Sequence, residues 1–333
     1  NLQGTVDGGQ ALTLSSGSAA ITADGAIGSS TALTSLTVNS SGAGTIEIAD
    51  IGTSSAVGVS GATAIGNTST GTLTLDGTVY TTTGTQTYTA ATGGGNIDIT
   101  NTAGTTFTTT NTAVAFNTSG VDLANNATTT IDTGTGAGDV TFQGAIETNG
   151  SDNDILTVTS GTGTVTFTGA IGATEELGGL NVNASSGNGV ITFTSTIGDS
   201  DNAGVIGTTS IGNAATSDLN FNSTIYKFDG ATTITAASGD TIDMGAGAAT
   251  TFTTAADNIT FATGNIELAN GSNLTVDTGA AGGNITIVGE IGGTSVETVT
   301  LDAGTGTTSV GVIGSGTEIG ALSIGSAENG GIT

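Results

Sequence analysis

Residues 163–172 read GTVTFTGAIG, and this short stretch decides the fold that we expect for the chain. Val165 and Phe167 alternate with threonines, which is the period-two pattern of a strand with one buried face. Gly169 interrupts the strand, and Ile171 then places one more apolar side chain on the buried side. The stretch therefore predicts a short strand closed by a turn.

Close relatives of this stretch recur on both sides of it. The segments at 138–146, GDVTFQGAI, and at 189–198, GVITFTSTIG, begin at a distance of roughly 25 residues from it in either direction. A strand and turn that return at a fixed period are the signature of a solenoid, in which each coil of chain stacks on the previous one. We therefore expect an all-β fold, a parallel β-helix with about 24 residues per coil.

A longer repeat is superimposed on the coil. Matching segments recur at an interval of about 145 residues: TFTT at 106–109 and 251–254, VDLAN at 121–125 and IELAN at 266–270, IDTG at 131–134 and VDTG at 276–279. Tyr80 and Tyr226 also occupy matching positions, which predicts a packing or corner role for both rings. The chain is therefore built from tandem copies of one long unit.

The repeat sets the domain organisation that we expect. One continuous solenoid covers residues 1–333, with a first super-repeat at 1–146, a second at 147–291 and a partial third at 292–333. Each full super-repeat would hold about six coils of roughly 24 residues. A single coil is too small to bury a core, so its stability must come from the coils on either side.

The composition favours strands over helices. The 333 residues include 58 glycines and no proline, and β-branched residues are abundant. Such side chains fit a pleated surface, while glycine, asparagine and aspartate supply the corners between strands. No window carries the 3.6-residue apolar stripe of a helix. The amino terminus lacks the basic and apolar segments of a signal peptide, so we expect a mature product or an internal fragment.

The charge excludes several classes of partner. There are 28 acidic residues against one basic residue, Lys227, which gives a formal net charge of −27. Such a chain cannot neutralise phosphates, so we expect no nucleic-acid partner and no docking on an anionic membrane. No apolar run approaches the length of a membrane helix, so we expect no membrane insertion. The absence of cysteine removes disulfides and thiolate metal sites.

The sequence offers few tools for catalysis. It contains no histidine, cysteine or arginine, so neither a Ser-His-Asp triad nor a Cys-His pair can be built. The counterpart of Lys227 in the first super-repeat is Thr81, which indicates a solvated surface residue. Glycoside hydrolysis requires a pair of carboxylates, and Asp152 and Asp154 are such a pair. Their sequence context instead indicates a polar turn. We therefore predict no catalytic residue and no enzyme.

Calcium is the metal that the acidic residues favour, because it binds carboxylate and carbonyl oxygens. Asp98, Asp122 and Glu147 follow one another at the period of the coil. The carboxylates would then stack on one face, where like charges are unfavourable unless water separates them or a cation bridges them. Both alternatives stay open.

A second calcium candidate lies in residues 199–204, DSDNAG. Asp199 and Asp201 resemble the early acids of a calcium loop, but Ala203 stands where the next oxygen ligand would be expected. The alternative is an ordinary polar turn. The candidate Ca²⁺ ligands are thus Asp98, Asp122, Asp199 and Asp201, and we expect no other cofactor.

A family resemblance extends these expectations. The run at 163–172, followed by LGGLNV at 177–182, resembles the tandem β-strand repeats of very large bacterial surface proteins. These include filamentous-haemagglutinin-like exoproteins and autotransporter passengers. The resemblance covers the whole chain and implies a right-handed parallel β-helix, secretion, and an adhesive or matrix role outside the cell or on its surface. The secretion and membrane-anchoring modules of that family are not visible here.

These observations together predict a structural role. We expect a segment of an extracellular filament, stalk or cell-surface adhesin that acts as a stiff acidic rod. Its partners would be further copies or continuing repeats, stacked end to end, and a host or neighbouring cell surface. The alternative is a surface-layer or glycan-binding module built on the same solenoid.

Overall fold

The computed structural model describes residues 1–150, 153–183, 186–294 and 296–325. These residues form short strands and no helix. The chain divides into two compact units, Asn1–Gly169 (unit 1) and Ala170–Thr333 (unit 2). In each unit, strands from successive coils pair in parallel. The predicted fold class, an all-β parallel solenoid, is confirmed.

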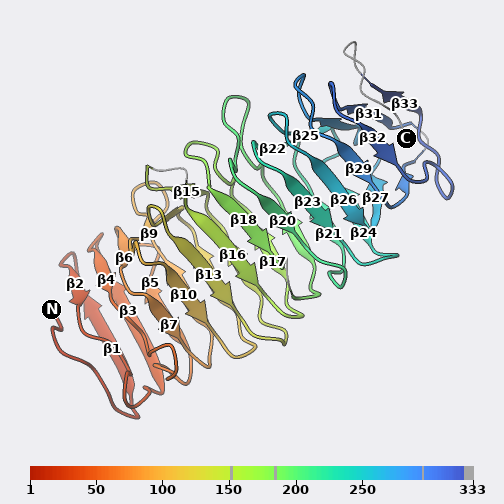
Figure 1. Cartoon of the computed structure of the whole chain (residues 1–333). Coiled ribbons are helices and arrows are strands. Elements are labelled where there is room, and N and C mark those ends of the chain that lie inside the picture. The colour runs from red at the N-terminus through yellow and green to blue at the C-terminus, as the bar shows by residue number, and fades with distance from the viewer. Residues whose placement is uncertain (151–152, 184–185, 295, 326–333) are drawn as a thin grey trace. The chain divides into compact units, whose positions relative to one another are not determined.

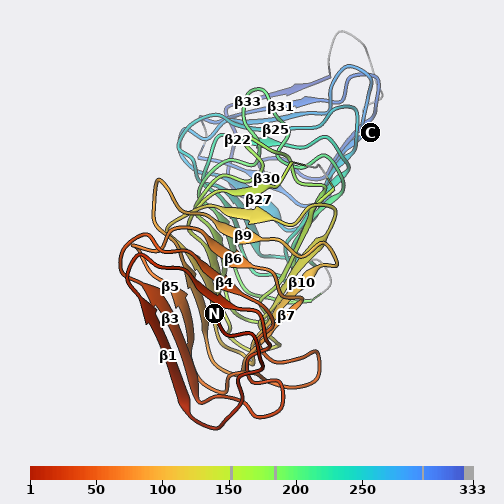
Figure 2. The same ribbon diagram turned by 90° about the vertical axis from the view of Figure 1, so that its left-hand side faces the viewer.

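Unit 1 has three rows of strands, which Figure 2 shows on three sides of the coil. The first row contains β1 (Ala11–Ser16), β3 (Ser35–Ser40), β5 (Thr63–Gly66), β8 (Gln86–Thr89), β11 (Val114–Asn117), β14 (Val140–Phe142) and β17 (Val165–Phe167). The second contains β2 (Ile21–Ala23), β4 (Ile46–Ile48), β6 (Leu73–Leu75), β9 (Ile97–Ile99), β12 (Val121–Leu123) and β15 (Ile146–Thr148). The third contains β7 (Val79–Thr81), β10 (Thr105–Thr108), β13 (Thr128–Asp132) and β16 (Ile155–Thr159), side by side in Figure 1.

Unit 2 also has three rows. One contains β19 (Ile191–Phe193), β21 (Leu219–Phe221), β24 (Thr241–Met244), β27 (Asn265–Leu268) and β30 (Ile291–Gly292). Another contains β22 (Ile225–Lys227), β25 (Thr250–Thr253), β28 (Leu274–Asp277), β31 (Thr298–Asp302) and β33 (Ala321–Ile324). The remaining row contains β18 (Gly179–Val182), β20 (Thr209–Ile211), β23 (Thr232–Thr235), β26 (Ile259–Thr263), β29 (Ile285–Ile287) and β32 (Thr308–Val310).

The coils vary in length, because the corners accommodate extra residues. Ala11 pairs with Ser35, whereas Leu36 pairs with Thr63, so the second of these coils is the longer. The longer coil includes a loop at residues 52–58, closed by a hydrogen bond from the Thr53 amide to the Ala56 carbonyl. The mean is roughly 25 residues per coil, slightly more than the number expected from the sequence. A repeat of about 145 residues therefore holds fewer than six whole coils.

The core consists of stacked columns of inward-facing side chains. All twelve aromatic residues of the sequence are fully buried: Tyr80, Tyr88, Tyr226, Phe107, Phe116, Phe142, Phe167, Phe193, Phe221, Phe228, Phe252 and Phe261. In unit 1, Phe142 stacks between Phe116 and Phe167, with ring centroids 4.9 and 5.4 Å away. In-register parallel pairing produces such stacks, because it repeats each inward position at about the strand spacing.

The two corresponding tyrosines hold corners, as their matching positions predict. The Tyr80 hydroxyl donates to the Ile48 carbonyl at 2.7 Å and accepts the Gly77 amide at 3.0 Å. The Tyr226 hydroxyl accepts the Ser223 amide at 2.8 Å. Each ring thus packs in the core while its hydroxyl satisfies a backbone group that the sheet leaves unpaired at the bend.

Asparagine and aspartate side chains carry the hydrogen-bond ladder across the corners. The Asp139 carboxylate accepts the amide of Thr164 at 2.8 Å, one coil later, and Asn284 does the same for Thr307 at 2.9 Å. Four further side chains accept a backbone amide of the next coil in the same way: Asn258 from Asn284, Asn265 from Glu290, Asn273 from Thr298, and Asp218 from Thr241. These residues therefore link each coil to the next where strands cannot.

Glycines allow the coils to approach each other at the corners. Gly169, which ends the strand in the stretch 163–172, shows why a glycine is required. A Cβ at this position would lie 2.2 Å from the carbonyl oxygen of Gly144 in the preceding coil. No side chain fits there, so the glycine that punctuates the sequence pattern marks a contact between backbones.

Candidate functional site

The structure brings Asp98 and Asp122 together. Both lie in the second row of unit 1, where β9 and β12 pair with Asp98 directly opposite Asp122. Asp122 is also opposite Glu147 on β15. One outward column therefore carries three carboxylates in succession, at about the spacing of neighbouring strands.

Burial and mutual repulsion both act on this pair. Half-burial raises the pKa of Asp98, and the charge of Asp122 adds to the rise. Burial also raises the pKa of Asp122, against a hydrogen bond of 2.7 Å from the Asn96 amide that lowers it. The Oδ1 atom of Asp98 is buried and accepts no hydrogen bond. Asp98 and Asp122 thus take up a proton more readily than a solvated carboxylate does.

The same pairing recurs in unit 2, at the positions that the long repeat relates to the first pair. Asp243 and Glu267 are directly opposite each other on β24 and β27. Burial raises the pKa of both side chains; the charge of Asp243 adds to the rise at Glu267. The acidic pair is therefore a feature of the repeated unit and is not confined to one coil.

A second acidic column was missed by the sequence analysis. Asp24, Asp50 and Asp76 follow one another at the period of the coil in unit 1. Burial raises the pKa of Asp76, and the charges of Asp24 and Asp50 raise it further. The same spacing criterion that identified Asp98 and Asp122 would have found this column. Asp50 also has a structural role, because its Oδ1 accepts the amide of Thr78 at 2.7 Å.

The other calcium candidates lie in an exposed turn. The Oδ1 atom of Asp199 accepts the amides of Asp201 and Asn202, both at 2.7 Å, and these bonds lower the pKa of Asp199. In the first super-repeat the hydroxyl of Thr53 occupies this position and accepts the amide of Ala56 at 2.9 Å. Both copies thus use a side-chain oxygen to close the turn, but only the second copy has a negative charge there.

The described residues contain no group of three or more histidine, cysteine, aspartate or glutamate side chains placed to hold a metal ion. Calcium binding at Asp98, Asp122, Asp199 and Asp201 stays a prediction. The oxygens of Asp98 and Asp122 and the solvent-facing oxygens of the 199–202 turn are the groups that would contact the ion.

The remaining candidates have structural surroundings. Lys227 points outward from β22, and its Nζ donates to the Ser200 carbonyl at 3.2 Å. Asp154 is buried and accepts the amide of Asn126, whereas Asp152 lies outside the described residues. Asp154 directly precedes β16, and its carboxylate serves the backbone of the preceding coil.

Comparison with protein-family models, curated proteins and solved structures finds no significant match. In the part of the chain that the structure describes, no helix is long and apolar enough to cross a membrane.

Proposed function

We propose that the chain is a structural segment of an extracellular filament, stalk or cell-surface adhesin. The observation that carries this proposal is the coil-to-coil pairing of every row in both units. In unit 2, for example, β25, β28, β31 and β33 form an uninterrupted parallel series. Each coil depends on its neighbours for hydrogen bonds and for core contacts, which favours a stiff, protease-resistant element.

The surface charge suits a long element exposed to solvent. A net charge of −27 with one basic residue keeps the chain soluble and opposes lateral sticking between copies. Pairing between the edges of successive coils is then the favoured mode of association. Its partners in this proposal are continuing repeats or further copies, and the surface to which the filament attaches.

The proposed location follows from the resemblance to bacterial surface repeats. The alternative role as a glycan-binding module lacks one usual element. Because every aromatic side chain is buried, no ring is exposed for stacking on a sugar. A surface-layer role differs from a filament role in the form of the assembly, which would be a two-dimensional lattice.

Negative-stain electron microscopy of the concentrated chain tests the proposal. At roughly 25 residues and about 4.8 Å per coil, one chain is expected to give a rod on the order of 60 Å long. Filaments of uniform width support end-to-end stacking, and single rods support continuation within one polypeptide. A two-dimensional lattice would favour the surface layer, and round particles would overturn the rod.

A further inference from the structure

Two asparagine–glycine pairs in the described part of the chain have both members exposed, Asn149-Gly150 and Asn270-Gly271. Such a pair can react with itself, because glycine has no side chain to keep its amide nitrogen away from the asparagine side chain. The nitrogen attacks Cγ and bonds to it, the Cγ–Nδ2 bond breaks, and the proton lost from the nitrogen leaves with ammonia. Water then opens the succinimide ring at one of its two carbonyls, which gives aspartate or isoaspartate.

The two glycines have nearly the same backbone conformation and similar space around them. The φ angle is +82° at Gly150 and +84° at Gly271. A Cβ at Gly150 would meet no atom within 4 Å, and the nearest atom to one at Gly271 would be the Gly247 carbonyl oxygen, at 3.3 Å. The pairs therefore differ chiefly in the partner of the glycine amide.

A buried carboxylate holds the amide of Gly271. This amide donates to Oε1 of Glu297 at 3.1 Å, and Glu297 is only 1% exposed. The hydroxyl and the amide of Thr294 both donate to Glu297 at 2.6 Å, and these bonds hold its pKa at about 2. The carboxylate is thus charged at neutral pH and too weak a base to remove the amide proton. Loss of that proton would instead bring two negative charges together, which is unfavourable.

The same contact recurs in unit 1. Asn125-Asn126 occupies the position of Asn270-Gly271 in the long repeat, and Asn126 is also left-handed, with a φ angle of +57°. Its amide donates to the buried carboxylate of Asp154. Each unit therefore places a buried carboxylate on the amide that follows this corner asparagine.

The amide of Gly150 lacks such a partner. No oxygen atom of the described residues accepts a hydrogen bond from it. Asn149 directly follows β15, so this pair begins a corner without a carboxylate on its reactive nitrogen. The nitrogen is then free to lose its proton to solvent.

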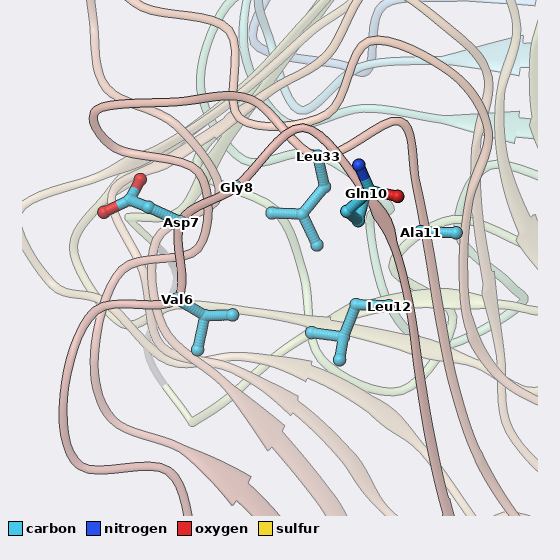
Figure 3. Close-up of a pocket in the computed structure, with 7 residues that line it drawn as sticks. All are labelled: Val6, Asp7, Gly8, Gln10, Ala11, Leu12 and Leu33. Carbon is cyan, nitrogen blue, oxygen red and sulfur yellow. The ribbon is translucent and has the colours of Figure 1, made fainter.

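Another reactive pair, Asp7-Gly8, is held by backbone groups of the next coil. Aspartate–glycine pairs form the same ring with loss of water in place of ammonia. Gly8 donates to the Thr31 carbonyl at 3.2 Å, and the Asp7 carboxylate accepts the amides of Ser30 and Thr31 at 2.8 and 3.0 Å. Figure 3 shows this carboxylate directed away from the groove that Leu12 lines. Both reacting groups of the pair are thus engaged.

We propose that Asn149 is a site of spontaneous conversion to aspartate and isoaspartate, and that Glu297 protects Asn270 by holding the amide of Gly271. Asp154 protects Asn125 in the same way. The inference is independent of the proposed function, because the reaction needs water but no partner molecule. Each conversion of Asn149 adds one negative charge to the chain.

Peptide mapping by mass spectrometry, with the full chain aged at mildly alkaline pH, tests this assignment. We expect Asn149 to convert about tenfold faster than Asn270 or more, because a hydrogen bond to a charged group is typically worth about a factor of ten in an equilibrium. In the urea-unfolded chain the two rates should be similar, since both asparagines precede glycine. Equal rates in the folded chain, or a faster reaction at Asn270, would overturn the proposal.

Glu297→Gln tests the carboxylate itself, because glutamine keeps the shape of the side chain and removes its charge. Conversion of Asn270 should become severalfold faster, and the rate at Asn149 should not change. An unchanged rate at Asn270 in the folded variant, with folding checked by circular dichroism, would contradict the protection. The comparison of folded with unfolded wild-type chain needs no substitution, so the proposal stays testable if this variant fails to fold.

Asn273→Ala is the matched control for a loosened corner. Asn273 accepts the amide of Thr298 at 2.7 Å, and its removal leaves the bond between Gly271 and Glu297 in place. We expect the rate at Asn270 to stay close to that of the wild type. A rise as large as in E297Q would assign the protection to general rigidity of the corner and overturn the role of the carboxylate.

Discussion

Replacing Phe142 by alanine tests whether the stacked aromatic column holds unit 1 together. Phe142 is fully buried and stacks on Phe116 and Phe167. Truncating a buried phenylalanine costs about 3–5 kcal/mol, and each aromatic pair adds about 0.5–1.5 kcal/mol beyond area burial. Because the column continues on both sides, the lost space cannot be filled by one neighbour alone. We therefore expect F142A to lower the free energy of unfolding by about 4 kcal/mol or more.

Urea denaturation followed by circular dichroism measures this change. The matched control is T141A, on the same strand but facing outward and only partly buried, for which we expect a change of about 0.5 kcal/mol or less. Solenoids can unfold in parts, so a local loss of the coils around β14 should appear as an added early transition. A change below about 1 kcal/mol for F142A, or equal changes for the two variants, would refute the reasoning.

Three further predictions concern the acidic columns. The raised pKa values of Asp98, Asp122, Asp243 and Glu267 favour the protonated folded state, so the melting temperature should rise as the pH falls from 7 towards about 4. Below that, stability should fall, because hydrogen bonds led by those of Thr294 hold the pKa of Glu297 at about 2 and its contribution is lost on protonation. Asp122→Asn should raise the melting temperature at pH 7 and flatten this pH profile; a lower melting temperature at pH 7 would contradict the repulsion. The calcium hypothesis predicts a lower melting temperature with chelator than with Ca²⁺, and an unchanged midpoint would count against it.

The sequence was sufficient to predict the fold because its determinants are local and repeated. Val165 and Phe167 alternate with threonine, Gly169 ends the strand, and the pattern returns after about one coil. Each inward position needs only an apolar side chain, because it packs against the equivalent apolar position of the neighbouring coil. The stacking of Asp98 on Asp122 also followed from their spacing once the coil length was estimated.

The corners were harder to predict. Thr53 and Asp199 close equivalent turns with different oxygens, so the aspartate resembled a metal ligand although the turn uses it as a backbone acceptor. The extra residues of these loops also change the coil length, which the mean period does not show. Asp154 and Glu297 occupy equivalent positions just before β16 and β31 but differ in residue type. Their common role becomes visible only through the amides that they accept.

The corner bonds to Asp139, Asn258, Asn273 and Asn284 share one direction, whereas Asp154 and Glu297 accept amides from the coil before them. Asp139, Asn258, Asn273 and Asn284 each accept an amide from the coil that follows, so a finished coil carries the acceptors for chain not yet in place. A polypeptide delivered with its amino terminus first would therefore meet a template at its growing end. Folding of this kind would proceed coil by coil from the amino terminus during synthesis or export. Each coil would become ordered as soon as it emerges.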